Sequence, residues 1–139
     1  MAYEATLITE YEPGVNMTCA DGSGIEAGAI LILSDPNTVA THTGAVATVA
    51  GIAGAEKIAS NGQTKIKVYK RGIFKFKGSG VITVGDPLVT DSHANHLKSA
   101  RALTTFDLSG CRIIGYALET MATGETGLME LAITPLNGV

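Results

Sequence analysis

The strongest constraint on the fold of this 139-residue chain is a unit that occurs twice in its sequence. Each copy has the same order: a glycine-led strand, a loop, a second strand with an internal glycine, a glycine turn and a third strand. Two such three-strand units can pack into one small barrel or sandwich and so protect edges that neither unit covers alone. The matched segments are Ala27–Asp35 with Val84–Asp91, Gly51–Ala53 with Gly115–Ala117, Asn61–Thr64 with Thr123–Thr126, and Ile66 and Val68 with Met129 and Leu131.

The segments between the glycines alternate with a period of two. Within Lys65–Gly80, apolar and basic residues alternate over Lys65–Val68 and again over Phe74–Lys77, with a shift near Arg71–Gly72 where a bulge or corner would bend one long strand. Asn61-Gly62 before it is a strong hairpin signal, and helical spacing of apolar residues is not seen. We therefore predict an all-β chain: a small β-barrel or sandwich of short strands, built from two related halves. The glycines predicted to form bends and turns are Gly51, Gly62, Gly72, Gly115 and Gly124.

Residues 1–20 differ from the rest and predict an extended N-terminal arm, with the barrel domain over residues 21–139. Pro13-Gly14 interrupts the alternation of this segment. Its first 13 residues, fully extended, would reach roughly 43 Å. Such an arm either closes the domain's own sheet or lies on a neighbouring molecule.

Composition narrows the function classes. Aromatic residues are only 5% of the chain, which disfavours a deep aromatic-lined ligand pocket. The N-terminus lacks a signal-peptide pattern and the longest apolar run, Ala27–Leu33, is too short to span a bilayer, so we predict a soluble protein made in a cytoplasm, with no membrane partner. Cys19 and Cys111 are interpreted as reduced packing residues, with a single bridge between them as the alternative.

Converging catalytic groups are not visible, so we predict that the chain is not an enzyme and has no cofactor. Asp91, His93 and His96 make a metal site imaginable, but a polar loop is the preferred interpretation and no metal is predicted. Alternation places Phe74 and Phe76 on the face opposite the neighbouring lysines, toward the core. This arrangement argues against a stacking platform for nucleic acid, and no nucleic-acid partner is predicted.

The order of several motifs resembles the capsid cement (decoration) proteins of tailed bacteriophages. The motifs are Arg71-Gly72-Ile73-Phe74, Gly85-Asp86-Pro87-Leu88 and the closing stretch Ile114–Thr120, within a resemblance that covers Ala27–Ile133. Met121 stands where the family pattern has a small residue, and Ser92–Ser109 has no motif to match.

This resemblance implies a compact β-barrel on the capsid exterior of the virion, commonly a trimer, that ties neighbouring major capsid subunits together. It implies the major capsid protein and other copies of this chain as partners, synthesis in the host cytoplasm, and no catalytic residues. The alternatives are a ligand- or metal-binding accessory barrel with His93 and His96 in its mouth, and another virion barrel of a tail or baseplate.

Two groups of residues are candidates for contacts with the capsid or a neighbouring subunit. The first is in the arm, which differs from the core in composition and has the reach to add a strand to a partner. The second is a basic strand face directed at acidic capsid loops or at the acidic arm of a neighbouring copy. The arm candidates are Tyr3, Glu4, Leu7, Ile8 and Tyr11, and the basic candidates are Lys65, Lys67, Lys70 and Arg71.

Overall fold

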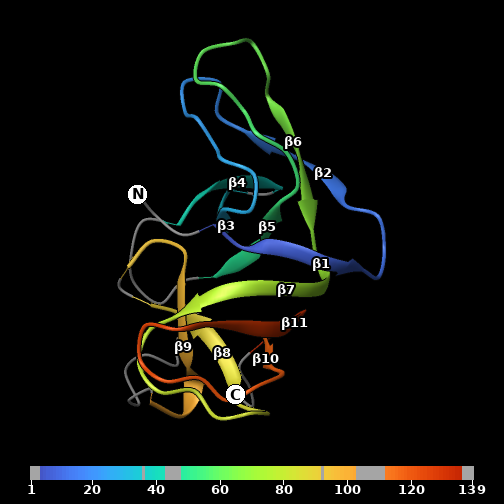
Figure 1. The fold of residues 1–139 in the computed structure, drawn as a ribbon. Helices are drawn as coiled ribbons and strands as arrows, with labels where there is room; N and C mark the ends of the chain where they lie inside the picture. The colour runs from blue at the N-terminus through green and yellow to red at the C-terminus, as the bar shows by residue number, and fades with distance from the viewer. Residues whose placement is uncertain (1–3, 36, 43–47, 92, 103–111, 136–139) are drawn as a thin grey trace.

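The computed structural model describes residues 4–35, 37–42, 48–91, 93–102 and 112–135, and the regular secondary structure of these residues consists of strands and one short 3-10 turn (Figure 1). The predicted all-β class is confirmed, since the 3-10 turn η1 (Ala100–Ala102) is the one helical element among the described residues. In the described residues there is no helix with the length and hydropathy to cross a membrane. The strands are β1 (Thr6–Glu10), β2 (Val15–Cys19), β3 (Ile30–Asp35), β4 (Thr38–Thr41), β5 (Val49–Ala53), β6 (Lys65–Tyr69), β7 (Arg71–Gly78), β8 (Pro87–Thr90), β9 (His96–Ser99), β10 (Arg112–Ala117) and β11 (Thr126–Pro135).

The strands form two closed five-stranded barrels and one additional strand. The first barrel has the order β2-β4-β3-β5-β6, with β6 returning to β2. The second has the order β7-β11-β10-β8-β9, closed by the pairing of β7 with β9. β1 pairs with the other end of β7 and lies between the two barrels in Figure 1.

The two barrels are topological copies of each other, which confirms the two related halves. β2 and β4 are parallel, as are β7 and β9, and the remaining neighbours within each barrel are antiparallel. An isolated bridge also recurs at the same place, Ile25 with Lys57 in one barrel and Ile82 with Met121 in the other. Each half has five strands, where three were predicted, and each closes a barrel of its own.

The predicted alignment of the last strand in each half was wrong in register. Val68 pairs with Ala53 and Met129 pairs with Ala117, so Val68 and not Ile66 is the counterpart of Met129. The connection from Ala53 to Val68 is three residues longer than that from Ala117 to Met129, so the two halves align only with a gap between these strands.

A long bent ribbon joins the two barrels. β6 and β7 are consecutive, separated at Lys70, and β2 and β1 run antiparallel beside them. The predicted corner in this strand is therefore present. Within residues 1–20, the predicted arm, β2 is a wall of the first barrel and β1 is a strand of the second sheet.

Alternating side chains fill each barrel and the junction between them. Leu31 and Val68 point into the first barrel, whereas Ile30, Val49 and Ile52 on its outer face join the core of the second barrel. β5 accordingly contacts β10 and β11. The two barrels are thus packed against each other through a continuous apolar cluster.

The predicted glycines fall into two kinds. A Cβ on Gly51 or Gly115 would overlap a carbonyl oxygen of the neighbouring strand, so these positions allow close backbone approach. Gly62 and Gly124 have φ of 86° and 81° in open turns, where the left-handed backbone conformation favours glycine.

Candidate capsid-binding surface

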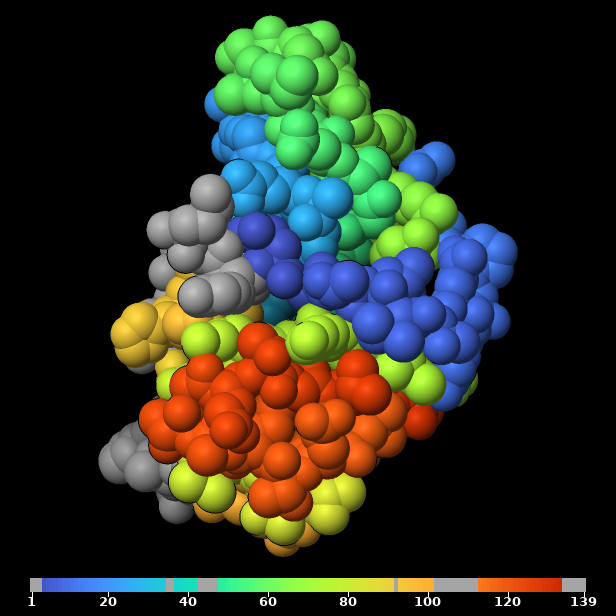
Figure 2. Space-filling model, viewed as in Figure 1, coloured from blue at the N-terminus to red at the C-terminus, as the bar shows by residue number. Residues whose placement is uncertain are grey.

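The N-terminal segment crosses the junction of the two barrels instead of projecting from the molecule. The Ala5 N–H donates to the Gly28 carbonyl oxygen at 2.8 Å, which ties the segment to the first barrel. Leu7 pairs with Phe74 of β7 and packs against the core of the second barrel. Figure 2 shows this blue segment running across the front of the molecule between the two barrels.

Two of the arm candidates present large apolar surfaces. Ile8 lies at a bulge in the pairing of β1 with β7 and is 52% exposed, and Tyr11 beyond the strand is 46% exposed. Glu4 and Leu7 are partly buried, and Tyr3 lies outside the described residues. Within this segment, therefore, Ile8 and Tyr11 are the candidates best placed to touch another molecule.

Three of the four basic candidates, Lys67, Lys70 and Arg71, already have partners within the chain. The Lys67 ammonium lies 4.8 Å from the centre of the Tyr69 ring, and the Lys70 ammonium donates to the Ala50 carbonyl oxygen at 3.0 Å. Lys65 is exposed.

Arg71 connects the two groups of candidates. Its guanidinium is 3.9 Å from a Glu130 carboxylate oxygen and 5.9 Å from the centre of the Tyr11 ring. The structure thus brings the end of the arm and the start of β7 together. Exposed ion pairs of this kind contribute little to stability, so Arg71 is accessible to an acidic partner at small cost.

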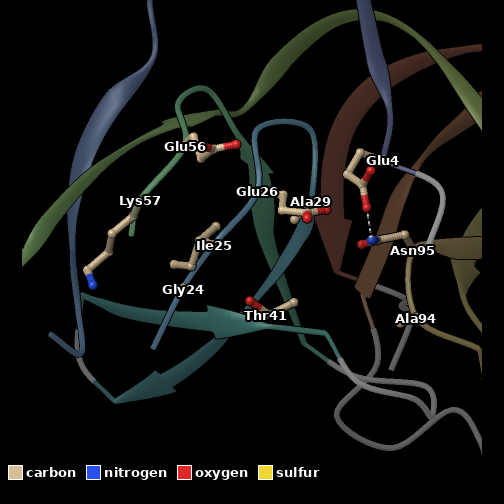
Figure 3. Close-up of a pocket in the computed structure, with 10 residues that line it drawn as sticks. All are labelled: Glu4, Gly24, Ile25, Glu26, Ala29, Thr41, Glu56, Lys57, Ala94 and Asn95. Atoms are coloured by element: carbon tan, nitrogen blue, oxygen red, sulfur yellow. Dashed lines mark hydrogen bonds between the residues drawn. The ribbon is translucent and has the colours of Figure 1, made fainter. Parts of the chain in front are cut away.

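An acidic recess lies at the other end of the N-terminal segment (Figure 3). Its cavity, of about 510 Å³, is lined by the carboxylates of Glu4, Glu26 and Glu56. Burial, and then a hydrogen bond and repulsion from Glu26, raise the pKa of Glu4 above its ordinary value. The Lys57 ammonium points away from this recess, as Figure 3 shows, and donates to the Asp21 carbonyl oxygen.

Asn95 holds this recess together and was not predicted from the sequence. Its side-chain oxygen accepts the Ile30 N–H at 2.9 Å, and its side-chain nitrogen donates to Glu4 at 3.4 Å. Asn95 has a φ of 61°, and its counterpart in the first barrel, Asn37, has a similar φ of 57°. An asparagine at the tight connection before β9 was the available signal, since asparagine tolerates this conformation better than most residues.

The histidine cluster lies beside the recess. The Nδ1 of His93 is 3.3 Å from an Asp91 carboxylate oxygen, and the rings of His93 and His96 are 5.4 Å apart. Burial, and then the charges of His93 and Lys77, lower the pKa of His96. In the part of the chain that the structure describes, no three or more His, Cys, Asp or Glu side chains are grouped to hold a metal ion.

Comparison with known proteins decides the family. Residues 8–133 match the family of phage cement proteins, a range that spans both barrels. The chain belongs to this family. The predicted resemblance is confirmed, and it assigns this phage cement protein a structural role on the phage capsid.

A solved structure supports the fold of the cement protein. The head fiber gp8.5 N base of bacteriophage phi29 superposes with a TM-score of 0.52 at 19% identity, over 89% of this chain and 98% of that one. At this identity the likeness shows a shared fold. A search of curated proteins found no significant match.

Proposed function

We propose that this phage cement protein binds the outer surface of an assembled capsid and ties neighbouring major capsid subunits together. The observation that carries the proposal is the family match over residues 8–133, which includes all strands of both barrels apart from the last two residues of β11, and all of β1 apart from its first two residues. A protein that binds only the assembled shell stabilises that state by its binding free energy, repeated at each site on the lattice.

The proposal includes the finer points that the resemblance implies. The protein is made in the host cytoplasm, associates with itself as a homotrimer, and joins the capsid exterior without carrying out catalysis. Two packed barrels joined by a continuous core suit this role, since a rigid body transmits load between the subunits that it contacts.

The contact surface that we propose centres on the N-terminal segment. Ile8 and Tyr11 supply exposed apolar area, and exposed aromatic residues are frequent anchors of protein interfaces. Arg71, beside Tyr11, supplies charge at its border, and Lys65 is exposed at the far end of β6; both favour acidic capsid loops and make binding sensitive to salt.

Co-sedimentation with purified expanded capsids tests the proposal directly. We expect saturable binding, and capsids carrying the protein should resist heat better than bare capsids. Ile8→Asp should weaken binding at least tenfold, whereas Ile58→Asp should not, because Ile58 is 67% exposed in a distant loop of the first barrel. Failure to bind intact capsids would refute the function, and unchanged binding by Ile8→Asp would remove β1 from the interface. Binding that is equal at low and high salt would count against the basic residues.

A further inference from the structure

We propose that β1 receives a strand from the capsid protein, in the cleft between β1 and the first barrel. The incoming segment is extended, basic at its ends and apolar in its middle. This inference rests on the proposed function and reverses the role expected of the arm, since the protein offers an edge instead of lending a free segment.

The first observation is the free edge of β1. Both barrels are closed, so among the described strands β1 is the one with an edge that has no neighbouring strand. Four of its five residues are exposed. An unpaired edge presents a row of backbone N–H and C=O groups to any extended chain that approaches it.

The second observation is a cavity beside this edge. It has a volume of about 290 Å³, enough for a large apolar side chain, and it lies between β1 and the turns of the first barrel. The Ala5–Gly28 hydrogen bond closes one end of the cleft. The lining residues are small or apolar apart from Thr6 and include Leu7, Gly54, Tyr69 and Phe74. A side chain on the incoming strand that inserts here would fix its register, because only alternate residues point to one side.

The third observation is charge. Carboxylates stand at both ends of β1: Glu4 beside Glu26 at its start, and Glu10 and Glu12 at its end. The basic residues near this segment belong to β7, where Lys75 is paired opposite Thr6 and Arg71 lies beside the Tyr11 ring. Lys67, which lies beside Gly54, is held over the Tyr69 ring. An occupant with Lys or Arg flanking an apolar residue matches this distribution of charge.

Detachment of β1 to act as a free arm is the competing mechanism, and the packing opposes it. Release of β1 would break its register with β7 over Gly72–Lys75 and withdraw Ala5 and Leu7 from the apolar core. Reception of a strand leaves all of these contacts in place and adds to them.

Hydrogen exchange of the full chain, free and bound to expanded capsids, distinguishes the two mechanisms. Strand reception predicts that amides of Thr6–Glu10 gain protection on binding while amides of Gly72–Lys75 keep theirs. Loss of protection over Gly72–Lys75 on binding would overturn the inference and establish arm release.

Filling the cleft gives an independent test. Gly54→Val places methyl groups against the Tyr69 ring and the flexible Lys67 side chain, and Gly54 has no positive φ. We expect capsid affinity to fall at least tenfold, with Gly22→Val as the matched control because a Cβ at Gly22 meets no atom within 4 Å. Unchanged affinity of a folded Gly54→Val protein would overturn the inference while wild-type binding upheld the proposed function.

A charge reversal at the end of β1 tests the same inference if the Gly54→Val protein does not fold. Glu10→Lys changes an exposed residue at the end of β1, and Glu119→Lys makes the same change on the second barrel. We expect only Glu10→Lys to weaken capsid binding at low salt, with the difference shrinking as salt rises. Equal binding by both variants would contradict a basic occupant. If Gly54→Val changed the sedimentation of the capsid-free protein, the occupant would be a second copy and the inference would fail.

Discussion

Substitution of Lys57 tests how much a buried ammonium group contributes to the stability of the first barrel. Its side chain is buried, at 2% exposure, and the ammonium donates to the carbonyl oxygens of Asp21 at 2.7 Å, Ser23 at 2.8 Å and Ile58 at 3.3 Å. The equivalent residue of the second barrel is Met121, which is also buried. Lys57→Met therefore keeps an unbranched apolar stem that the same fold already accepts, and removes only the charged head.

The expected cost follows from the lost hydrogen bonds and what replaces them. A hydrogen bond to a charged group contributes about 1.5–3 kcal/mol, so the two short bonds set an upper limit of about 6 kcal/mol. Ser23 and Ile58 are exposed residues, so water reaches carbonyls that the ammonium leaves. The mutant also no longer desolvates a charge. We expect a net loss of about 2 kcal/mol.

Chemical denaturation followed by circular dichroism measures this loss. A loss of about 2 kcal/mol should also lower the melting temperature by roughly 5–10 °C in a domain of this size. Lys65→Met is the matched control, because Lys65 is exposed and its change should stay within about 0.5 kcal/mol. A Lys57→Met protein as stable as the wild type would refute the reasoning, since it would show that the three carbonyls need no ammonium.

Three further perturbations test the fold at separate places. Gly115→Ala should destabilise by about 3 kcal/mol because its Cβ meets a neighbouring carbonyl, whereas Gly124→Ala, in open space with positive φ, should cost about 1 kcal/mol in the same denaturation assay. Burial would raise the pKa of Asp86, but hydrogen bonds from neighbouring groups outweigh it and hold this pKa below its ordinary value. The stability it gives is present above about pH 4 and lost as pH falls through the folded pKa, so Asp86→Asn should flatten the acid limb of a pH–stability curve. Asn95→Ala leaves the buried Ile30 N–H without its acceptor, and exchange of that amide should accelerate at least tenfold.

Local features of the fold were predictable because short-range physics determines them. Alternation in Lys65–Gly80 identified the long strand and its corner, since period two separates the two faces of a sheet. Asn61-Gly62 marked the turn before it, and the recurrence of Gly51 at Gly115 marked the duplication. The order of the motifs then indicated the cement protein family, although each motif alone marks only a turn or the start of a strand.

Long-range pairing was not predictable from the same patterns. The parallel contacts of β4 with β2 and of β9 with β7 close the barrels, and no local signal distinguishes them from antiparallel neighbours. The local sequence pattern therefore could not distinguish a half of three strands from a half of five. Asn95 was missed for the same reason, because its partners Ile30 and Glu4 are distant in sequence.

The duplication explains why the candidate surface lies at the junction and not on either barrel alone. Closed barrels have no free strand edges, so two such barrels offer a partner only side chains. The segment that precedes the repeat, β1, has no counterpart among the described strands of the second half and adds one open edge beside β7. The same segment supplies Ile8, Tyr11 and the carboxylates that flank the cleft. In this structural protein, the two barrels thus form the packed scaffold. The candidate surface for binding the capsid lies on β1, the described strand outside the repeat.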